Sequence, residues 1–368
     1  MFLTTLAATA AHAAIPSSER AALLTFFSST GGNNWTVHTN WSGANGTECT
    51  WFGVVCDGIQ SHVAGIVLPN NNLTGTLPAL TAFTNLQNFD VDTNAITGSL
   101  PAIKSLSNLQ SFSVNNNKLT GSIPSLTGMN ALQNVNVDTN QLTGSLPTLT
   151  GSSNLQEFTA FGNQLTGSIP VLTGLFNLRN FSVFDNQLGG AIPSLAGLAS
   201  LQYFFVDGNQ LTGSLPTTLN TDAPGLIEFG AGNNLLTGGI PSLTGLTSLQ
   251  QFDVHANKLT GSIPTLTSLS SLGFFYVNNN ALNGSIPTLS TLSNLQAITL
   301  GGNVLTGSVP AAPANLTAGQ SSLCTNNLQT NSSPNDAAWN AATGLTHWYA
   351  TPFANNKCDD VFNDQFEK

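Results

Sequence analysis

Hydrophobic residues recur along this chain at a fixed spacing of 23 residues. A segment L-x-x-[FVI]-x-[VAL]-x-x-N-x-[LI] runs into a second segment, L-x-G-x-[ILV]-P, and successive copies differ by 23 residues except for one step of 25, between Leu211 and Leu236. The second segment begins at Leu73, Ile96, Leu119, Leu142, Leu165, Leu188, Leu211, Leu236, Leu259, Leu282 and Leu305. A unit this short cannot bury its own apolar residues, so consecutive units must stack on one another.

The pattern predicts one short strand in each unit. In Phe89-Asp90-Val91 an apolar residue alternates with a polar one, as in a strand with one buried face. Stacked strands form a parallel sheet that rises about 4.8 Å per coil. The asparagine after each strand, such as Asn94 or Asn163, is expected to satisfy backbone groups of adjacent coils. The glycine and proline that follow permit a bend and then an extended segment. The sequence therefore predicts an α/β repeat solenoid.

The two ends of the chain differ from the repeats. Ser17 is expected to cap a helix and Gly31 to end it, and the helix carries the apolar residues Ala22, Leu23, Phe26 and Phe27. All tryptophans and cysteines lie outside the repeats, which fits end structures that cover the apolar faces of the first and last coils. The C-terminal cover is expected to begin at Cys324 and to include Trp339, Trp348 and Tyr349.

The repeat resembles the plant-type leucine-rich repeat, whose consensus contains N-x-L-x-G-x-I-P; the family's usual period is 24, one residue longer than here. The preceding segment resembles the N-terminal cap of the same family through Trp41, Cys49, Trp51, Gly53, Val54 and Cys56, which match W…C-x-W-x-G-V-x-C. The resemblance implies a curved right-handed superhelix with the parallel sheet on its concave face, a helical N-terminal cap and disulfide-closed ends.

The N-terminus and the cysteines indicate export. Residues 1–14 are apolar and small, with an A-x-A cleavage pattern at Ala11-His12-Ala13. The spacing favours disulfides Cys49–Cys56 and Cys324–Cys358 over a zinc site, and such bonds persist in extracellular compartments. We therefore expect a signal-peptide remnant (1–13), an N-terminal cap (14–63), about eleven 23-residue repeats (64–310), a C-terminal cap (311–358) and an acidic tail (359–368).

Charge narrows the choice of partners. Seven Lys and Arg stand against 17 Asp and Glu, and the basic residues are scattered, so the chain lacks the basic surface that nucleic acid requires. No stretch is long and apolar enough to predict a membrane span.

The search for catalytic or metal-binding patterns argues against an enzyme. The five histidines form no H-E-x-x-H motif, and no G-x-S-x-G segment occurs. Asp90 and Asp92 are a close carboxylate pair on an open sheet, which offers poor desolvation for acid catalysis. The segments at 90–94 and 136–140 resemble calcium loops but lack the required spacing. We expect a non-enzymatic protein with no cofactor and no metal.

If the solenoid curves as its family does, the outward strand positions line the concave face. Phe161, Phe184, Tyr203 and Phe205 would then form an aromatic cluster on consecutive coils, and Phe274 and Tyr276 a second one. Exposed aromatic residues on neighbouring coils indicate an interaction surface, although they can also simply pack on one another. The candidate ligand-binding residues are Phe161, Phe184, Tyr203, Phe205, Glu157, Asp185, Asp207, Glu228, Asp253, His255, Phe274 and Tyr276.

Three functions remain open. The first is a secreted, monomeric recognition protein that binds a protein or peptide partner on the concave face. The second is binding of a cell-wall polysaccharide or other glycan on the same aromatic residues, or inhibition of wall-degrading enzymes, as the family resemblance implies. The third is ice binding through rows of threonine, such as Thr127, Thr150 and Thr173, that repeat from coil to coil.

Overall fold

The computed structural model describes residues 15–329, 336–345 and 347–348. The expected signal-peptide remnant, the acidic tail, Tyr349 and Cys358 lie outside these residues. The chain divides into two compact units, Met1–Thr143 and Gly144–Lys368, and each is described by itself.

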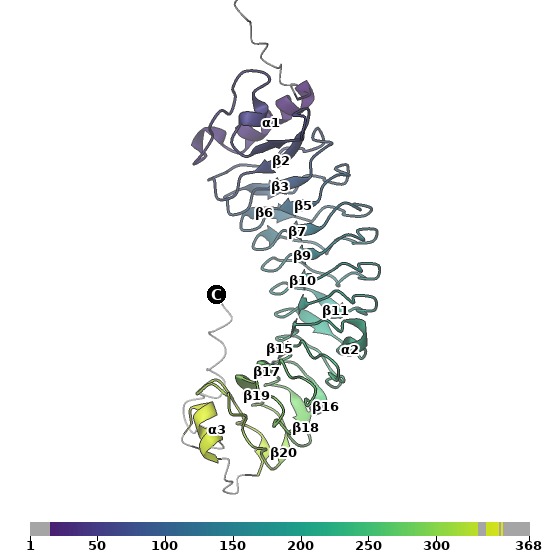
Figure 1. The fold of residues 1–368 in the computed structure, drawn as a ribbon, viewed down its shortest axis with the longest axis vertical. Helices are drawn as coiled ribbons and strands as arrows, with labels where there is room; N and C mark the ends of the chain where they lie inside the picture. Colours follow the sequence, from purple (N-terminus) through teal and green to yellow (C-terminus); the bar gives the residue numbers. More distant parts are fainter. Residues whose placement is uncertain (1–14, 330–335, 346, 349–368) are drawn as a thin grey trace, which may run out of the picture. The chain divides into compact units, whose positions relative to one another are not determined.

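The N-terminal unit begins with a cap and continues into parallel coils (Figure 1). β1 is antiparallel to β2, whereas β2, β3, β5 and β7 are parallel and in register, so that Phe89 lies beside Phe112. The elements are α1 (Ser17–Ser29), η1 (Gly32–Asn34), η2 (Glu48–Thr50), β1 (Val54–Cys56), β2 (Val63–Val67), β3 (Asn88–Asp90), β4 (Thr97–Ser99), β5 (Ser111–Ser113), β6 (Lys118–Gly121), β7 (Asn134–Asn136) and β8 (Gln141–Leu142).

The cap confirms the expected helix and one disulfide. α1 buries Leu23 and Phe26, and Gly31 follows it in the left-handed conformation at φ 71°. The expected role of Ser17 was wrong, because Pro16 occupies the N-cap and no side chain caps the helix. Cys49 and Cys56 form a disulfide with Cα atoms 5.5 Å apart.

The second unit contains the candidate site. Its strands β9, β10, β12, β14, β15, β17 and β19 pair in parallel, each with the next. The elements are β9 (Glu157–Thr159), β10 (Asn180–Ser182), β11 (Gly189–Ala191), β12 (Tyr203–Phe205), β13 (Gln210–Thr212), α2 (Leu219–Asp222), β14 (Glu228–Gly230), β15 (Gln251–Asp253), β16 (Thr260–Ser262), β17 (Phe274–Tyr276), β18 (Ala281–Asn283), β19 (Ala297–Thr299), β20 (Thr306–Gly307), β21 (Asn327–Leu328) and α3 (Asp336–Thr343).

A column of buried phenylalanines runs through the core of this unit. Each is the central residue of its strand: Phe158, Phe181, Phe204, Phe229, Phe252 and Phe275. All six are fully buried, and successive rings stack with centroids 5.5 to 5.7 Å apart. Because each ring packs on the ring of the next coil, the column fixes the strand register and holds the outward residues in straight rows.

The repeated asparagine connects neighbouring coils, as the sequence predicts. Nδ2 of Asn209 donates to the carbonyl oxygens of Val183, Val206 and Asp207 at 3.1, 3.2 and 2.9 Å. Its Oδ1 accepts a hydrogen bond of 2.9 Å from the backbone N–H of Leu188. One side chain thereby satisfies backbone groups of two coils that would otherwise be buried without partners.

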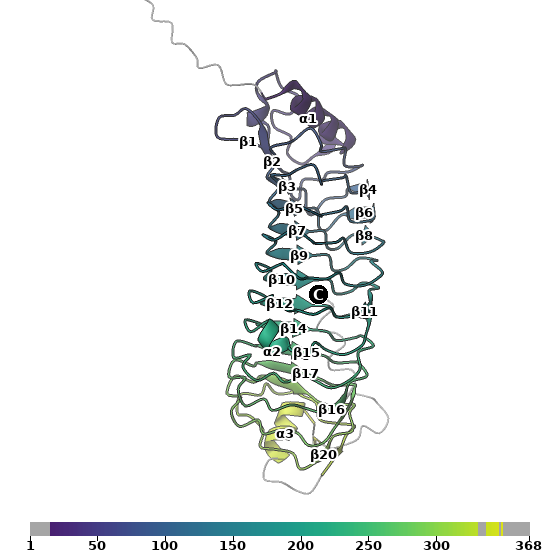
Figure 2. The same cartoon turned by 90° about the vertical axis from the view of Figure 1, so that its right-hand side faces the viewer.

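A second set of short strands lies on another side of the coils. Figure 2 shows β4, β6 and β8 away from β3, β5 and β7 in the first unit. The threonines of these segments are exposed, and their hydroxyls lie within hydrogen-bond distance of a glycine carbonyl of the preceding coil; Thr237 Oγ1, for example, is 3.2 Å from Gly213 O. These threonine rows thus present hydroxyls that already have a protein acceptor.

The C-terminal end is closed by α3. Trp339 is fully buried and donates from Nε1 to the carbonyl oxygen of Pro310 at 2.8 Å, and Trp348 is buried as well. Cys324 is buried, while its predicted partner Cys358 lies outside the described residues. The two tryptophans of this segment therefore cover the last coils, as expected.

Candidate ligand-binding surface

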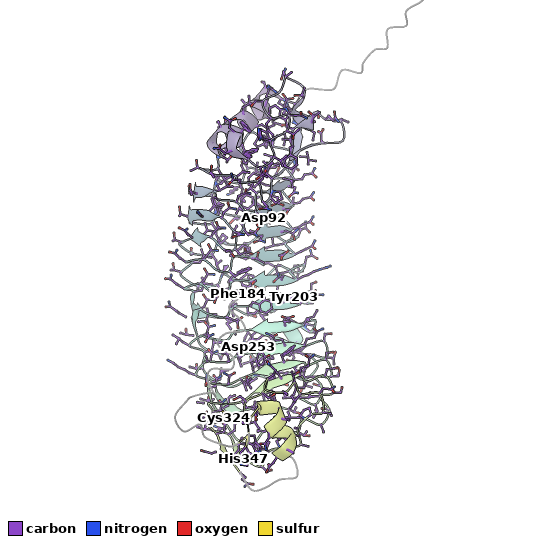
Figure 3. All side chains as sticks on the ribbon, turned by 90° about the vertical axis from the view of Figure 1, so that its left-hand side faces the viewer. Asp92, Phe184, Tyr203, Asp253, Cys324 and His347 are labelled. Carbon is purple, nitrogen blue, oxygen red and sulfur yellow. A yellow bond between two sulfur atoms is a disulfide. The ribbon has the colours of Figure 1, made fainter. Side chains whose placement is uncertain are left out.

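The outward positions of the second unit form a regular grid. Each coil contributes the first and third residues of its strand and the residue two places beyond it, because these alternate with buried residues. We call this grid the sheet face, and Figure 3 labels three of its members, Phe184, Tyr203 and Asp253. Its rows, in chain order, are Glu157, Thr159, Phe161; Asn180, Ser182, Phe184; Tyr203, Phe205, Asp207; Glu228, Gly230, Gly232; Gln251, Asp253, His255; Phe274, Tyr276, Asn278; and Ala297, Thr299, Gly301.

Four of the predicted aromatic residues come together on this face. Phe161 and Phe184 stack with ring centroids 4.3 Å apart and planes 8° from parallel. Tyr203 and Phe205 belong to the next coil, where they pair in register with Asn180 and Ser182. All four side chains are half-buried. The rings thus pack on one another and still leave apolar surface in contact with water, so both interpretations of the cluster hold in part.

Small polar residues lie beside these rings. Thr159 and Ser182 are paired in register and each is 4% exposed. Asn180 donates from Nδ2 to Glu157 Oε1 at 3.1 Å. Among the described residues, two buried side-chain atoms have no hydrogen-bond partner: Thr159 Oγ1 and Asn180 Oδ1. Sequence reasoning assigned no role to Thr159, Asn180 or Ser182; short polar residues among the aromatic residues of neighbouring coils were the available signal.

A group of ionisable side chains forms around two glycines. His255 Nδ1 lies 2.6 Å from Asp253 Oδ1, and the carboxylate also accepts the backbone N–H of His255 at 3.0 Å. Asp207 reaches across the neighbouring coil and accepts the backbone N–H of Gly232 at 2.7 Å. A Cβ atom on Gly232 would overlap the imidazole of His255, and one on Gly230 would overlap Asp207. The absence of side chains at these glycines therefore lets the Asp207 carboxyl and the His255 ring approach from opposite sides.

The electrostatics of this group favour its protonated forms. Burial, followed by the negative charge of Asp253, raises the pKa of Asp207 to about 8. Burial alone lowers the pKa of His255, but the hydrogen bond and charge of Asp253, together with Asp207, raise it on balance. Burial also raises the pKa of Glu228. At neutral pH the group therefore holds a neutral Asp207 and a cationic His255 paired with Asp253.

Other predicted residues are placed less favourably for a ligand. Tyr276 and Asp253 are 7% and 5% exposed, so the expectation that they face solvent was wrong. Phe274 contacts Tyr276 with ring centroids 6.1 Å apart in a tilted arrangement. Asp185 is exposed in the turn after β10. Across the residues that the structure describes, no three His, Cys, Asp or Glu side chains are arranged to hold a metal ion.

Comparison with known families supports the interpretation of the repeat. Residues 16–57 match the family described as leucine rich repeat N-terminal domain, and residues 108–129 match leucine rich repeat. No curated protein sequence gives a significant match. Within the described residues, none of the helices has the length and apolar character needed to cross a membrane.

Solved structures with a similar fold include plant receptors. The plant peptide hormone receptor RGFR1 in complex with RGF2 is 32% identical, with a TM-score of 0.66, over 70% of this chain and 43% of the receptor chain. The Arabidopsis receptor kinase HAESA, in complex with the peptide hormone IDA and the co-receptor SERK1, is 30% identical, with a TM-score of 0.67, over 71% and 45%. The protein thus spans less than half of either receptor chain.

A plant ice-binding protein is also similar, at 22% identity and a TM-score of 0.58, over 81% of this chain and 90% of that one. At this identity the similarity concerns the fold alone. Together with the repeated coils, the in-register parallel strands and the family matches, these structures assign the protein the fold of a leucine-rich-repeat solenoid.

Proposed function

We propose that the protein is a secreted, non-enzymatic recognition protein that binds a protein or peptide partner on the sheet face of its second unit. The observation that carries this proposal is the group of four half-buried aromatic side chains, Phe161, Phe184, Tyr203 and Phe205, on three consecutive coils. Aromatic residues with exposed apolar area are enriched at interfaces because their burial by a partner is favourable and costs little side-chain entropy.

The surroundings of the aromatic group favour a partner with basic residues. Glu157 and Glu228 lie on the same face, Asp185 is exposed in an adjoining turn, and the chain carries a formal net charge of −10. A negative surface attracts cationic groups and accelerates their association. The receptors RGFR1 and HAESA, whose structures are similar, are described in complex with peptide or hormone ligands, which supports peptide recognition by this fold.

Extracellular localisation is part of the proposal. The Cys49–Cys56 disulfide supports it, since such bonds persist in oxidising compartments. The N-terminal segment that predicts a signal peptide lies outside the described residues. Fractionation of cells that express the tagged full-length chain tests this part directly, and the tagged chain is expected in the medium or cell-surface fraction.

Glycan binding is the second candidate. Phe161 and Phe184 are nearly coplanar in orientation, and aromatic platforms suit the apolar faces of sugar rings. Salt distinguishes the two candidates. Binding of a basic protein weakens as ionic strength rises, because salt screens the attraction between surface charges, whereas binding of a neutral polysaccharide tolerates salt.

The experiment is a binding assay with the purified protein against cell-wall polysaccharides and an extract of secreted proteins. The variant Phe161→Ala/Phe184→Ala/Phe205→Ala is run in parallel. A matched control is Val171→Ala/Phe176→Ala, which removes exposed apolar side chains, 68% and 61% exposed, from outside the sheet face. Loss of capture in the triple variant alone supports the proposal, and the nature of the captured partner separates protein from glycan. Equal capture by all three proteins contradicts it.

A further inference from the structure

Two buried polar atoms on the sheet face have no partner in the free protein: Thr159 Oγ1 and Asn180 Oδ1. A buried hydroxyl or carbonyl without a hydrogen bond lowers the stability of the folded chain, and native proteins contain few such groups. Valine or leucine at these positions would avoid the cost. The two atoms therefore require an explanation beyond the stability of the free protein.

Asn180 has a defined orientation. Its Nδ2 donates to Glu157 Oε1 at 3.1 Å, and a carboxylate oxygen accepts hydrogen bonds, so the nitrogen of the amide faces Glu157 and the oxygen faces away. Asn180 is paired in register with Glu157 on β9 and with Tyr203 on β12. Its Oδ1 is thus an acceptor held in place by Glu157 and situated next to the aromatic residues.

Thr299 shows that the fold can satisfy a buried threonine in the same row position. It is 1% exposed, compared with 4% for Thr159, and its hydroxyl donates to Asn278 Oδ1 at 2.6 Å. The corresponding position beyond β9 and β10 is occupied by Phe161 and Phe184, which offer no acceptor. The unpaired hydroxyl of Thr159 is therefore a consequence of placing the stacked phenylalanines beside it.

We propose that Thr159 and Asn180 together bind a main-chain amide group of a basic peptide segment. The Thr159 hydroxyl donates to the peptide carbonyl, and Asn180 Oδ1 accepts the peptide N–H. The segment's Lys or Arg side chain then lies against the Phe161–Phe184 stack, where the faces of aromatic rings attract cations, with Glu157 nearby. This inference rests on the proposed function of the sheet face and specifies the anchor within it. Because both atoms are buried, binding requires that neighbouring half-buried side chains turn aside.

The first test needs no partner. Thr159→Val removes an unsatisfied hydroxyl at nearly constant volume, so we expect its thermal midpoint to rise by about 2 °C. Thr299→Val is the matched control: it removes a satisfied hydroxyl and leaves Asn278 without its donor, so its midpoint is expected to fall. A fall of similar size in both variants would show that Thr159 is a structural residue and would overturn the proposal.

The second test uses a phage-displayed library of short random peptides as the probe. Peptides recovered on the wild-type protein are expected to be enriched in Lys and Arg, and to bind Thr159→Val and Asn180→Leu about 10-fold more weakly, while Thr299→Val binds them normally. Peptides that depend on Phe161 but bind Thr159→Val and Asn180→Leu at full strength would overturn the anchor and leave the proposed function intact. If the sheet face recovers no Phe161-dependent peptides, the proposed function itself fails for peptides. Loss of polysaccharide binding in Thr159→Val would instead assign the anchor to a glycan and contradict the peptide.

Discussion

Phe161 and Phe184 stack across two adjacent coils, with ring centroids 4.3 Å apart and planes 8° from parallel. They stand in the same row position as Asp207 and His255 further along the chain, so one edge of the sheet face changes from aromatic to ionisable within three coils. Both groups depend on the buried phenylalanine column, which holds the strands in register.

The phenylalanine column should dominate the stability of the second unit. Phe204 is fully buried and stacks on Phe181 and Phe229 at 5.6 Å each. We predict that Phe204→Ala lowers the free energy of unfolding by about 3–5 kcal/mol, since it removes buried area and leaves a cavity. Chemical denaturation measures this value. Phe161→Ala, at a half-buried position, should cost clearly less, and an equal loss in both variants would contradict the assigned roles.

Gly232 should be intolerant of a side chain. Its added Cβ would overlap the His255 ring, so Gly232→Ala must displace the imidazole and disturb its pairing with Asp253. We predict a loss of about 1–3 kcal/mol in the free energy of unfolding. Gly239→Ala is the matched control, because its Cβ would meet only the Thr260 carbonyl oxygen at an ordinary 3.6 Å. Denaturation curves that coincide for the two variants would contradict the observed packing.

Stability should fall as pH rises through neutrality. The pKa of Asp207 is about 8 in the folded protein and has an ordinary value of 3.8, so between these values unfolding releases a proton and becomes more favourable as pH rises. The raised pKa of His255 acts in the same direction above its ordinary value of 6.5. Denaturation between pH 5 and pH 9 measures the slope, which for one group is at most about 1.4 kcal/mol per pH unit.

Asp207→Asn tests the assignment of this slope. Asparagine resembles the protonated carboxyl and does not titrate, so the variant should gain stability relative to the wild type as pH rises towards 8. Its carboxamide oxygen can still accept the N–H of Gly232. A pH profile that is unchanged by this substitution would show that Asp207 is ionised at neutral pH and would contradict its raised pKa.

The disulfide should stabilise the N-terminal cap. Cys49 and Cys56 are seven residues apart, and closing such a loop restricts the unfolded chain by about 2 kcal/mol. We predict that Cys49→Ser/Cys56→Ser lowers the thermal midpoint of the cap. A reducing agent should lower the midpoint of the wild type and leave that of the variant unchanged. Equal midpoints of the oxidised wild type and the variant would contradict a stabilising role.

The sequence allowed most of the fold to be predicted, because each repeat states the same physical solution. The spacing of Phe181 and Phe204 and the position of Asn209 determine the coil, its register and its hydrogen bonds without reference to distant residues. Ser17 shows the limit at a boundary: it is the first residue of α1, and Pro16 takes the cap position.

The candidate site was less predictable, since alternation states which side a residue faces and not how its neighbours cover it. Tyr276 and Asp253 face outward but are buried by adjoining side chains. Asp207 reaches Gly232 on the next coil, an approach that depends on a missing Cβ rather than on a motif. Thr159 stands out only when its lack of an acceptor is compared with Thr299.

The central claim is that the sheet face binds a partner through its aromatic group. The most direct measurement compares recovery of a phage-displayed library of short peptides on the wild-type protein, on Phe161→Ala/Phe184→Ala/Phe205→Ala, and on Val171→Ala/Phe176→Ala. We predict that basic peptides recovered on the wild type and on the control are lost on the triple variant, provided that circular dichroism shows all three to be folded. Recovery of the same peptides on the folded triple variant would contradict the claim.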